Sequence, residues 1–593
     1  MGAPHRNAAH VAKPPKDMSH HYSDVTKARV PSKMKEYYKY FLIPGIGNLA
    51  GGLPNARFFP FDTLEAQIAK PDRWTPSPNR PGADSPASEM AAMALSSPSE
   101  PSAASHVVVP HDAQTSDPTK KIDLASALQY GQATGYPPLL SFIRQFAREC
   151  LHPNVPYAGG PEVIFTTGST DGMAKALELF TNIWVPGKND VRERPGLLTE
   201  VFMYSNVLNQ AKPRGVRTCP VEMDEEGMAP FGPGGLEDVL ENWDDSKGKR
   251  PHLMYTVTMG HNPTSGVLSL KRRKEIYALC SKYDVIIVED DPYWYLQYPS
   301  AEIEEAKARH LPIPEAQAAN TLEKKSGYPF IDSLVPSFLS IDVDGRVICE
   351  RIMRINESGT QQPSGFVQVV IAEAVMGPQP DASAVFASRS RRDQPNFNGW
   401  KMDGWVRWLA GLRGQYERRM KRMCSILEDN AYQLKQSTPM RESDADWGVI
   451  TKTKLYDFEW PRGGMFLWLR MHFESHPLFG ATGSKGNVIN GVALSTALML
   501  FLTHKPYLVL VSPGMMFSAT DQIRGERGWA YYRLCFAAET EENIDSCSLR
   551  FAQGTQKFWR IKKVKELEAI LEDQSASAED VEGLVNMGSY MGC

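Results

Sequence analysis

The sequence predicts an α/β protein, with a mostly parallel central sheet in a large domain and a second, smaller α+β domain. Residues 121–348 alternate between helical stretches and short apolar runs, the pattern of parallel strands joined by crossover helices. Helices dominate residues 349–572, with a few strand-like runs among them. A chain of 593 residues is too long for one simple core, which also favours two domains.

The segments outside these domains differ from them in composition. Residues 1–35 are polar and rich in Lys and His, so we expect a flexible arm. Residues 36–70 are aromatic and interrupted by Gly and Pro, which predicts an ordered segment that packs on the small domain. Residues 71–120 are rich in Pro, Ser and Ala and should form a disordered insertion, because they cannot bury enough apolar surface to offset the entropy of ordering. Residues 573–593 are expected to be an acidic tail.

Individual elements follow from shorter patterns. Four apolar runs of the large domain are predicted strands: Val163–Thr167, Leu253–Thr258, Val285–Glu289 and Phe338–Ile341. The small domain is predicted to contain a long amphipathic helix near Met402–Leu434 and strands near residues 465–471, 507–512 and 531–537. The large domain is expected to be truncated at its end, near residue 348.

Charge and cysteine usage exclude several classes of function. The 65 basic and 69 acidic residues nearly cancel, so the chain lacks the basic surface that nucleic acids or acidic membranes attract. The eight cysteines are scattered without zinc-type spacing, which predicts no metal site and a reducing, cytoplasmic location. The longest apolar run, Val492–Leu502, is too short to span a bilayer and is expected to be a buried helix. A small-molecule partner is the expected ligand.

Two segments, GHNPTSG at 260–266 and VEDDPYWYL at 288–296, lie at the two ends of one βαβ unit. In open parallel sheets, ligands bind at the carboxyl ends of strands, and Asn262 and Asp290 fall at such ends. Taken singly, Asn262 is a common turn residue and Asp290 a common helix cap or solvated acid. Tyr293, three residues after Asp290, makes the combination more specific.

This combination resembles the class I and II aminotransferases of pyridoxal phosphate fold type I. It looks closest to the fungal aromatic amino-acid aminotransferases and their kynurenine/2-aminoadipate relatives. The resemblance implies pyridoxal 5'-phosphate as cofactor, and transamination of aromatic or kynurenine/2-aminoadipate type amino acids with a 2-oxo acid acceptor. It also implies that Asp290 pairs with the pyridinium nitrogen of the cofactor and keeps it protonated. Asn262 and Tyr293 would hydrogen-bond the cofactor's phenolic oxygen.

Other positions match cofactor-binding residues of the family. Ser169 and Thr170 begin a predicted helix, whose amino terminus is a natural cradle for the phosphate, although such a turn is common in itself. Tyr204 matches the aromatic residue that stacks on the pyridine ring, with Phe202 where relatives have proline. Tyr130 corresponds to a tyrosine that reaches the phosphate of the neighbouring subunit, which implies a homodimer with shared sites.

Two positions match substrate-binding residues. Arg533 lies where the family places the arginine that binds the substrate's α-carboxylate, and a guanidinium forms a two-pronged hydrogen-bonded pair with such a group. As an isolated strand residue, Arg533 would more often be a surface ion-pair partner. Gly52 belongs to a Gly-Gly-Leu-Pro stretch that resembles the segment covering the substrate, and by itself this stretch is only a turn.

The Schiff-base lysine of the family is not found in this chain. In relatives, the strand after the Asp-x-x-Tyr unit leads into a Ser-x-x-Lys turn and then to an arginine that binds phosphate. Here the chain passes from Ile348 directly to Cys349 and the following helix. Lys324 and Lys325 precede the strand and Lys401 lies beyond the helix, so none of them takes the place of the missing residue.

We therefore expect the chain as written to be inactive or severely impaired. The lysine both links the cofactor and moves the proton from the substrate's Cα, so no catalytic residue can be assigned. One explanation is a segment lost from the written sequence, for example by a skipped exon. The alternative is a lysine-less pseudoenzyme that binds cofactor or amino acid in a regulatory role. An aminotransferase-like transcription regulator would need a basic helix-turn-helix segment near the amino terminus, and residues 1–120 show none.

Overall fold

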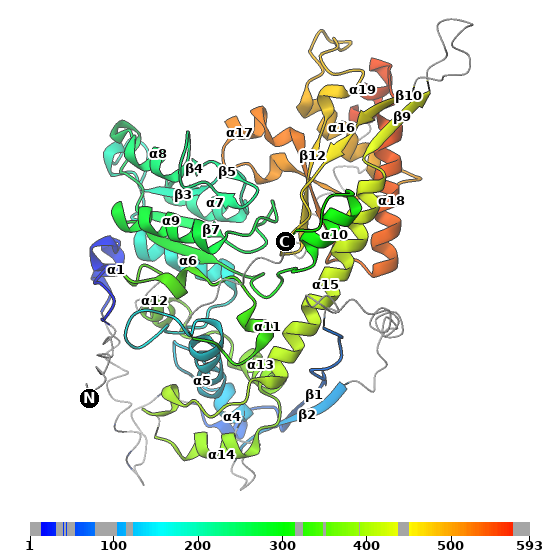
Figure 1. Cartoon of the computed structure of the whole chain (residues 1–593). Helices are drawn as coiled ribbons and strands as arrows, with labels where there is room; N and C mark the ends of the chain where they lie inside the picture. The colour runs from blue at the N-terminus through cyan, green and yellow to red at the C-terminus, as the bar shows by residue number, and fades with distance from the viewer. Residues whose placement is uncertain are drawn as a thin grey trace, which may run out of the picture.

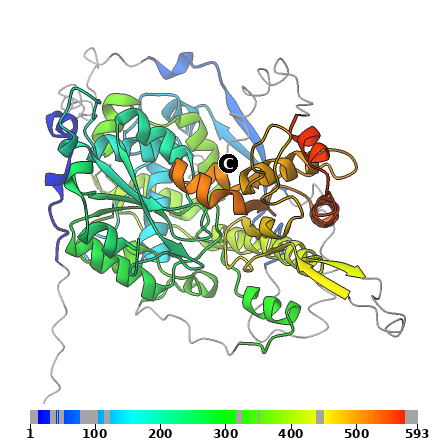
Figure 2. The same cartoon turned by 90° about the horizontal axis from the view of Figure 1, so that it is seen from above.

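The computed structural model describes residues 13–30, 40, 43, 52, 54–76, 104–113, 122–314, 324–347, 352–390, 392–436 and 450–572. An α/β layer and a helical layer lie on one side of the molecule, and a mixed unit lies on the other (Figure 1). The view from above shows the same division (Figure 2). The long helix α15 (Asp403–Asp429) joins the two sides. The predicted tail at 573–593 lies outside the described residues.

The central sheet of the described residues has four parallel strands in the order β4-β3-β7-β8. These are β3 (Gly196–Glu200), β4 (Arg217–Val221), β7 (Leu253–Val257) and β8 (Ile286–Asp290). Every residue of β3 and β7 is buried, as expected for strands covered on both faces. Beyond β8, Val347 makes a single parallel bridge to Ile287. The α/β class with a parallel central sheet is confirmed, and so are the two predicted strands that became β7 and β8.

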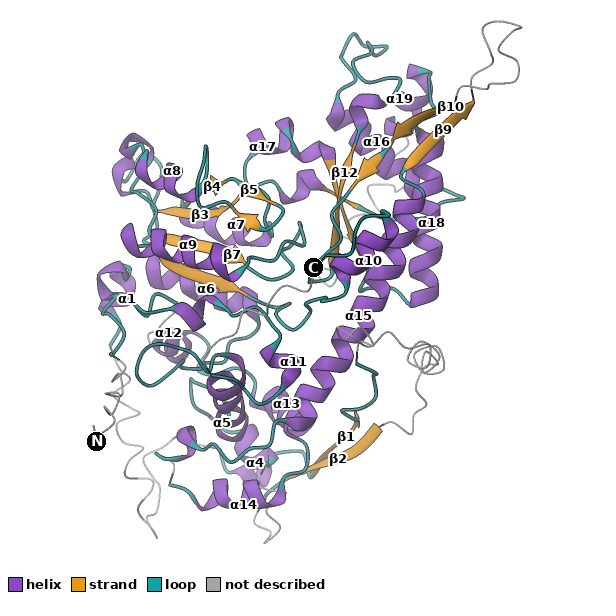
Figure 3. Cartoon of the chain, in the orientation of Figure 1, coloured by secondary structure: helices purple, strands orange, loops and turns teal. Residues whose placement is uncertain are grey.

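Helices flank this sheet (Figure 3). They are α6 (Ser169–Phe180), α7 (Asn206–Ala211), α8 (Leu236–Glu241) and α9 (Leu270–Lys282). Helix α9 begins where the Ser269 side chain accepts a hydrogen bond from the Arg272 N–H group at 3.2 Å. It buries Ile276, Leu279 and Cys280 on one face, so the chain returns beside β7 as β8.

The predictions of two other strands were wrong. Residues 163–167 form no strand, because the backbone of Phe165 bonds to a loop carbonyl at 3.0 Å and to the Asn356 side chain at 2.9 Å. Residues 338–341 form a 3-10 helix, which begins where the Glu289 carboxylate accepts a hydrogen bond from the Phe338 N–H group at 3.0 Å. Both runs are apolar enough for strands, but neither pairs with a strand among the described residues.

Part of the predicted flexible arm is ordered, so that prediction was wrong for residues 13–30. Met18 is buried among the helices next to the sheet. The short helix α1 (Asp24–Ala28) is capped by Ser23, whose hydroxyl also donates to the Glu178 carbonyl at 2.7 Å. These contacts attach the segment to α6.

Part of the predicted disordered insertion is also ordered. Strand β1 (Thr63–Ala69) pairs antiparallel with β2 (Ala104–Pro110), which lies inside the range assigned to the insertion. The β-branched run around Val109 supplies the strand, and Val109 is buried against the helical layer. The prediction of disorder was therefore wrong for residues 104–113, while 77–103 lie outside the described residues.

The helical layer has a core of its own. Its helices are α4 (Leu124–Ala127), α5 (Pro137–Gln145), α11 (Pro329–Asp332), α13 (Gly365–Met376) and α14 (Pro380–Ser388). Phe142 of α5 and Val369 of α13 share this core with Leu409, from the first half of α15. The boundary between cores therefore lies within α15 rather than at residue 349.

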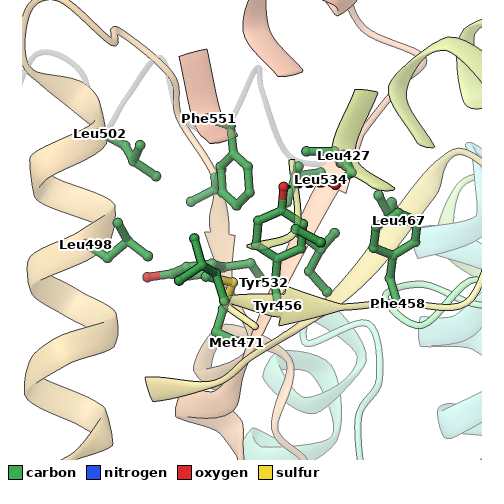
Figure 4. Packing of buried hydrophobic residues seen from close by; sticks show 14 of the residues in the cluster. Leu427, Tyr456, Phe458, Leu467, Met471, Leu498, Leu502, Tyr532, Leu534 and Phe551 are labelled. Atoms are coloured by element: carbon green, nitrogen blue, oxygen red, sulfur yellow. Dashed lines mark hydrogen bonds between the residues drawn. The ribbon is translucent and has the colours of Figure 1, made fainter. Parts of the chain in front are cut away.

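The mixed unit contains a four-stranded antiparallel sheet in the order β11-β12-β14-β13. The strands are β11 (Tyr456–Asp457), β12 (Phe466–Met471), β13 (Ser512–Pro513) and β14 (Tyr531–Cys535), and the main helices are α16 (Gly491–Thr503), α18 (Glu541–Phe558) and α19 (Val564–Glu572). Leu427 of α15, Leu498 of α16 and Tyr532 of β14 meet in its core (Figure 4). The predictions at 465–471 and 531–537 are confirmed, and the run at 507–512 is a strand only at its end.

The remaining elements connect or extend these layers. They are α10 (Ala301–Ala308), α12 (Ile352–Gly359), α17 (Asp521–Glu526), the short pair β5 (Met223–Asp224) and β6 (Gly227–Met228), and the hairpin of β9 (Tyr432–Gln436) and β10 (Ile450–Lys454). The β9–β10 hairpin projects away from the mixed unit in both views (Figures 1 and 2). Among the helices of the described residues, none has the length and apolar character needed to cross a membrane.

Candidate active site

Asp290 is the last residue of β8, and its carboxylate lies at the carboxyl edge of the sheet. It accepts a hydrogen bond at 2.7 Å from the hydroxyl of Tyr255, which β7 carries. Burial raises the pKa of Asp290 above its usual range, and the bond from Tyr255 offsets part of that rise. Sequence reasoning missed Tyr255, because a tyrosine in a buried strand is usually only core.

Arg533 brings the mixed unit into contact with the loop after β7. Its Nη1 donates a hydrogen bond at 2.8 Å to Oδ1 of Asn262. The buried guanidinium lies over the rings of Phe466 and Phe517, at 4.2 Å and 4.6 Å from the two centroids. Two rings and an amide oxygen thus hold a positive charge next to the sheet edge.

Tyr293 connects these two groups. Its ring meets Phe466 edge to face at 5.8 Å between centroids. It also lies close enough to Tyr255 to act on it electrostatically, although burial and Asp290 contribute more to the raised pKa of Tyr255. Four predicted residues, Asn262, Asp290, Tyr293 and Arg533, are therefore joined through direct neighbours. We call them, together with Tyr255, the strand-end cluster.

The predicted phosphate residues begin α6. Ser169 and Thr170 are exposed, and Gly168 before them has a φ of +89°, a conformation that favours glycine. The Thr170 carbonyl accepts a hydrogen bond from Gln210 of α7 at 3.1 Å. The free amides of this helix terminus and the two hydroxyls are therefore directed to solvent or to a ligand.

Tyr204 lies in the loop between β3 and α7. It is partly buried next to the sheet core, one residue before the cap of α7. The preceding residue, Met203, donates its N–H to the carbonyl of Phe517 at 2.8 Å, and Phe517 is one of the two rings under Arg533. The α7 end of the site and the mixed unit are thus tied together.

Tyr130 and Gly52 lie in a different neighbourhood. Tyr130 is 61% exposed, and its N–H bonds to the side chain of Gln129 at 3.0 Å. Gln129 in turn donates to the carbonyl of Pro54 at 2.8 Å, next to the exposed Gly52. The hydrogen bonds of the described residues do not join this pair directly to the strand-end cluster.

A buried ion pair stabilises the chain next to the strand-end cluster. Arg273 and Glu289 meet at 2.6 Å with side chains 0% and 5% exposed, and Thr258 also donates to Glu289 at 2.7 Å. Burial, and after it the charge of Glu289, raise the pKa of the adjacent Asp291 well above its usual range. Asp291 belongs to this network through Thr258, whereas Asp290 bonds to Tyr255.

A second buried pair supports the turn that carries Asn262. Glu200, the last residue of β3, accepts a hydrogen bond from Thr256 at 2.6 Å. Its other carboxylate oxygen lies 3.7 Å from Nε2 of His261, and both side chains are almost fully buried. His261 also bonds to the Thr264 hydroxyl at 2.9 Å, inside the same turn. No sequence pattern indicates this pair, since its partners lie 61 positions apart and come together only in the fold.

The three lysines that were rejected as the Schiff-base residue are not members of the strand-end cluster. Lys324, Lys325 and Lys401 are exposed. Lys175 is a buried lysine that the sequence analysis did not single out, and it forms an ion pair with Asp171 in the first turns of α6. Asp171 also accepts a hydrogen bond from the backbone just before α6, which places this pair behind the helix terminus.

Comparisons with known proteins agree with this geometry. No protein-family model matches the chain. An aromatic amino acid aminotransferase of Schizosaccharomyces pombe is 32% identical over 438 residues, which cover 69% of this chain and 77% of that protein. An L-tyrosine:2-oxoglutarate aminotransferase of Tapinella panuoides is 27% identical over 605 aligned positions, covering 92% of this chain and 97% of that protein.

A solved structure supports the same relationship. The crystal structure of the aminotransferase Aro8 from Candida albicans superposes with a TM-score of 0.65 at 26% identity, covering 93% of this chain and 100% of that one. The relatives and the fold together show that the chain belongs to the aromatic amino acid aminotransferases, enzymes of fold type I whose cofactor is pyridoxal phosphate.

Proposed function

We propose that the strand-end cluster binds pyridoxal 5'-phosphate and an aromatic amino acid, with a 2-oxo acid such as 2-oxoglutarate as acceptor. Kynurenine or 2-aminoadipate would be the other substrate type. The observation that carries the proposal is the contact between Arg533 and Asn262, which the rings of Phe466, Tyr293 and Tyr255 connect to Asp290. It brings an arginine suited to a carboxylate close to an acid suited to a pyridinium ring.

The residues present fit the cofactor. Burial disfavours ionisation of Asp290, so a cationic ring nitrogen beside it would stabilise the charged carboxylate. The amino terminus of α6, with Ser169 and Thr170, offers amides and hydroxyls to a phosphate. Tyr204 offers a ring face, and Asn262 a hydrogen-bonding side chain.

Each of these groups has a part in transamination. Pyridoxal phosphate, when bound, supplies an electron sink for the electrons of the amino acid's Cα–H bond. Asp290 holds the positive charge of the ring that makes this sink effective. Arg533 would fix the substrate's α-carboxylate, and Asn262 and Tyr293 would hydrogen-bond the phenolic oxygen of the cofactor.

The chain as written lacks the lysine that would move the substrate proton. We therefore propose that it holds the cofactor without a covalent link. Loss of a general acid/base alone lowers a rate by roughly 100- to 10,000-fold. We thus expect this protein to bind the cofactor but to catalyse transamination slowly or not at all.

The binding part is tested by titrating the purified full chain with pyridoxal 5'-phosphate and following cofactor absorbance. Borohydride reduction and peptide mass spectrometry then report any covalent attachment. We expect saturable binding and no lysine adduct. A stable adduct on Lys175, or on any other lysine, would contradict the loss of the linking residue. An absence of binding would overturn the proposed function.

The catalytic part needs a matched pair of chains. One is the chain as written, and the other carries a relative's Ser-x-x-Lys segment, through its phosphate arginine, inserted between Ile348 and Cys349. With phenylalanine or tyrosine and 2-oxoglutarate, we expect the second chain to be faster by roughly 100-fold or more. Equal rates would show that another group in this chain performs the proton transfer.

We also infer that the protein is a homodimer in the cytoplasm. The exposed ring of Tyr130 supports the dimer, because its family counterpart reaches the neighbouring subunit's phosphate. The six cysteines among the described residues are all free thiols, which supports a reducing compartment. Sedimentation of the full chain tests the first inference, and microscopy of a fluorescently labelled chain tests the second.

A further inference from the structure

A second group of polar side chains lies at the opposite end of β8 from Asp290. Asp284 precedes this strand by two residues, so six residues, or about 20 Å of extended chain, separate it from Asp290. His20 and His21 belong to a 3-10 turn of the amino-terminal segment, Ser19–His21. Their Nε2 atoms lie 2.7 Å and 3.0 Å from the same oxygen, Oδ2 of Asp284. The possible ligand atoms of these three residues all lie within 4.8 Å of one another.

His21 is the buried member of this group. Its side chain is only 7% exposed, and its ring stacks on that of His252 with 5.0 Å between centroids and 5° between planes. Although Nε2 points at Asp284, it makes no hydrogen bond within the part of the chain that the structure describes. A buried ring nitrogen without such a bond costs free energy, which a bound cation would recover.

The carboxylate of Asp284 is oriented from its other side. Arg346 donates to Oδ1 at 2.9 Å, which leaves Oδ2 directed toward the two imidazoles. Arg346 also donates to Asp344 at 2.8 Å, and Asp344 pairs with Lys16 at 2.6 Å. Two cationic side chains, Arg346 and Lys16, thus meet two anionic ones, Asp284 and Asp344, while Lys249 lies close enough to act on His21 electrostatically.

We propose that His20, His21 and Asp284 bind one divalent transition-metal ion, with zinc the best chemical match. Two imidazole nitrogens and one carboxylate oxygen are ordinary zinc ligands, and water would take the fourth position. Tetrahedral bonds of about 2.0–2.1 Å place ligand atoms roughly 3.3 Å apart. The separations of 2.7 Å and 3.0 Å would open by about 0.6 Å and 0.3 Å, and the two imidazole nitrogens already lie within 4.8 Å of each other. The His20 side chain is 55% exposed, so it can make that movement and leaves a side open to water.

The ion would fasten the amino-terminal segment to the large domain. Met18, just before the histidines, is already buried next to the sheet, and α1 just after them lies against α6. A metal bond to Asp284 adds a link from this segment to the start of β8. The site is structural and separate from the strand-end cluster. Sequence spacing predicted no metal site, and it could not have indicated this group, because His20 and Asp284 are 264 positions apart.

Calorimetry tests the site by titrating zinc chloride into the full chain after chelator treatment. The variants are His20→Ala and His21→Ala, of which the first removes a half-exposed ring and leaves the buried contacts in place. The matched control is His106→Ala, since His106 is an exposed histidine 3.0 Å from a carboxylate oxygen of Glu65. We expect one ion per chain in the wild type and the control, and affinity at least about 100-fold weaker in both cluster variants.

Three results would overturn the proposal. They are a wild-type chain that takes up no zinc, uptake that is equal in His20→Ala, and sulfur-to-metal charge-transfer absorption with Co²⁺, which would place the ion on cysteines. Thermal unfolding gives a second readout, because a ligand that binds only the folded state raises Tm. Zinc should raise Tm of the wild type and of His106→Ala but not of His20→Ala. If zinc left the Tm of the wild type unchanged, the proposal would also be overturned, because His20, His21 and Asp284 would then form only an ion pair.

Discussion

At the scale of single residues, the charge of Asp290 is the feature on which cofactor binding depends most. Breaking a buried charge pair by neutralising one partner costs about 3–5 kcal/mol. We therefore expect Asp290→Asn to weaken pyridoxal phosphate binding by about 100-fold or more. Tyr255→Phe keeps the charge and removes one hydrogen bond, so it should cost about tenfold. Absorbance titration measures both, and equal affinity of Asp290→Asn and the wild type would contradict the role of this acid.

Arg533 makes a second prediction possible at this scale. Lysine in its place keeps the charge but loses the two-pronged geometry and the stacking on two rings. With cofactor bound, we expect Arg533→Lys to weaken binding of an aromatic amino acid or a 2-oxo acid by about tenfold or more. Calorimetry reports the affinity, and Arg470→Lys, an exposed change on the neighbouring strand β12, is the control. A similar loss in both variants would indicate a general electrostatic effect.

The sequence predicted which residues to examine better than it predicted their neighbours. Asn262 and Asp290 lie at the same sheet edge, because parallel strands end together, and this follows from pattern alone. Tyr255 and Phe517 contact Asp290 and Arg533 only through tertiary packing. No spacing in one sequence specifies such contacts.

At the scale of elements, the ion pair between Arg273 of α9 and Glu289 of β8 offers a sharp test of stability. Arg273→Met leaves Glu289 buried without its cation and should lower the free energy of unfolding by about 3–5 kcal/mol. The neighbouring Arg272 pairs with the half-exposed Asp224, so Arg272→Met should cost less than about 1 kcal/mol. Urea unfolding of the two variants measures the difference. Equal losses would mean that burial of the pair is unimportant.

Strands could be predicted where the local residue pattern and the neighbouring strands favour the same structure. β7 and β8 are apolar runs with parallel partners, and both were located within a residue. The runs at 163–167 and 338–341 are equally apolar but pair with no strand among the described residues, and one is irregular while the other is a 3-10 helix. Whether an apolar run becomes a strand depends on its partner, which a local pattern does not contain.

At the scale of the whole molecule, buried neutral histidines should set stability at acid pH. His476 donates to the Phe558 carbonyl at 3.2 Å and accepts from the Leu478 N–H at 3.1 Å, so no site is left for a second proton. Burial lowers the pKa of His476, and that of His152, to about 4. The unfolded chain binds these protons near pH 6.5, so stability falls as pH drops from about 6.5 toward 4. Glu373 acts oppositely, because burial raises its pKa to about 7 and favours the protonated folded state.

Two histidines outweigh one glutamate over this range, so these groups together predict a net loss of stability with falling pH. Urea unfolding midpoints at pH 7, 6 and 5 measure it. His476→Gln should flatten the dependence by about 1.4 kcal/mol per pH unit, the value for one proton. An unchanged slope in this variant would show that His476 is already charged in the folded protein.

The division into domains was predictable only in part. Alternation of helices and strands indicated the large domain, and the helix-rich second half indicated another unit. The helices from 365 to 402 were assigned to that unit by their position in the chain, yet they share a core with α5, and α12 packs on α6. Their apolar faces show that they are buried but do not show against which partner.

Helix α15 determines how the two halves of the protein can move. Asn262 belongs to one half and Arg533 to the other, and α15 contributes to the cores of both, so a rigid-body movement of one half relative to the other would tilt or bend this helix. Gly411 and Gly414 lie buried near its middle. Because glycine has no side chain, a helix bends at glycine with a lower free-energy cost. A side chain at Gly411 would meet the carbonyl of Trp74 at 2.6 Å. The Trp74 carbonyl also accepts a hydrogen bond from Arg407 at 2.8 Å, so the segment before the insertion packs against the point of α15 where a bend is least costly.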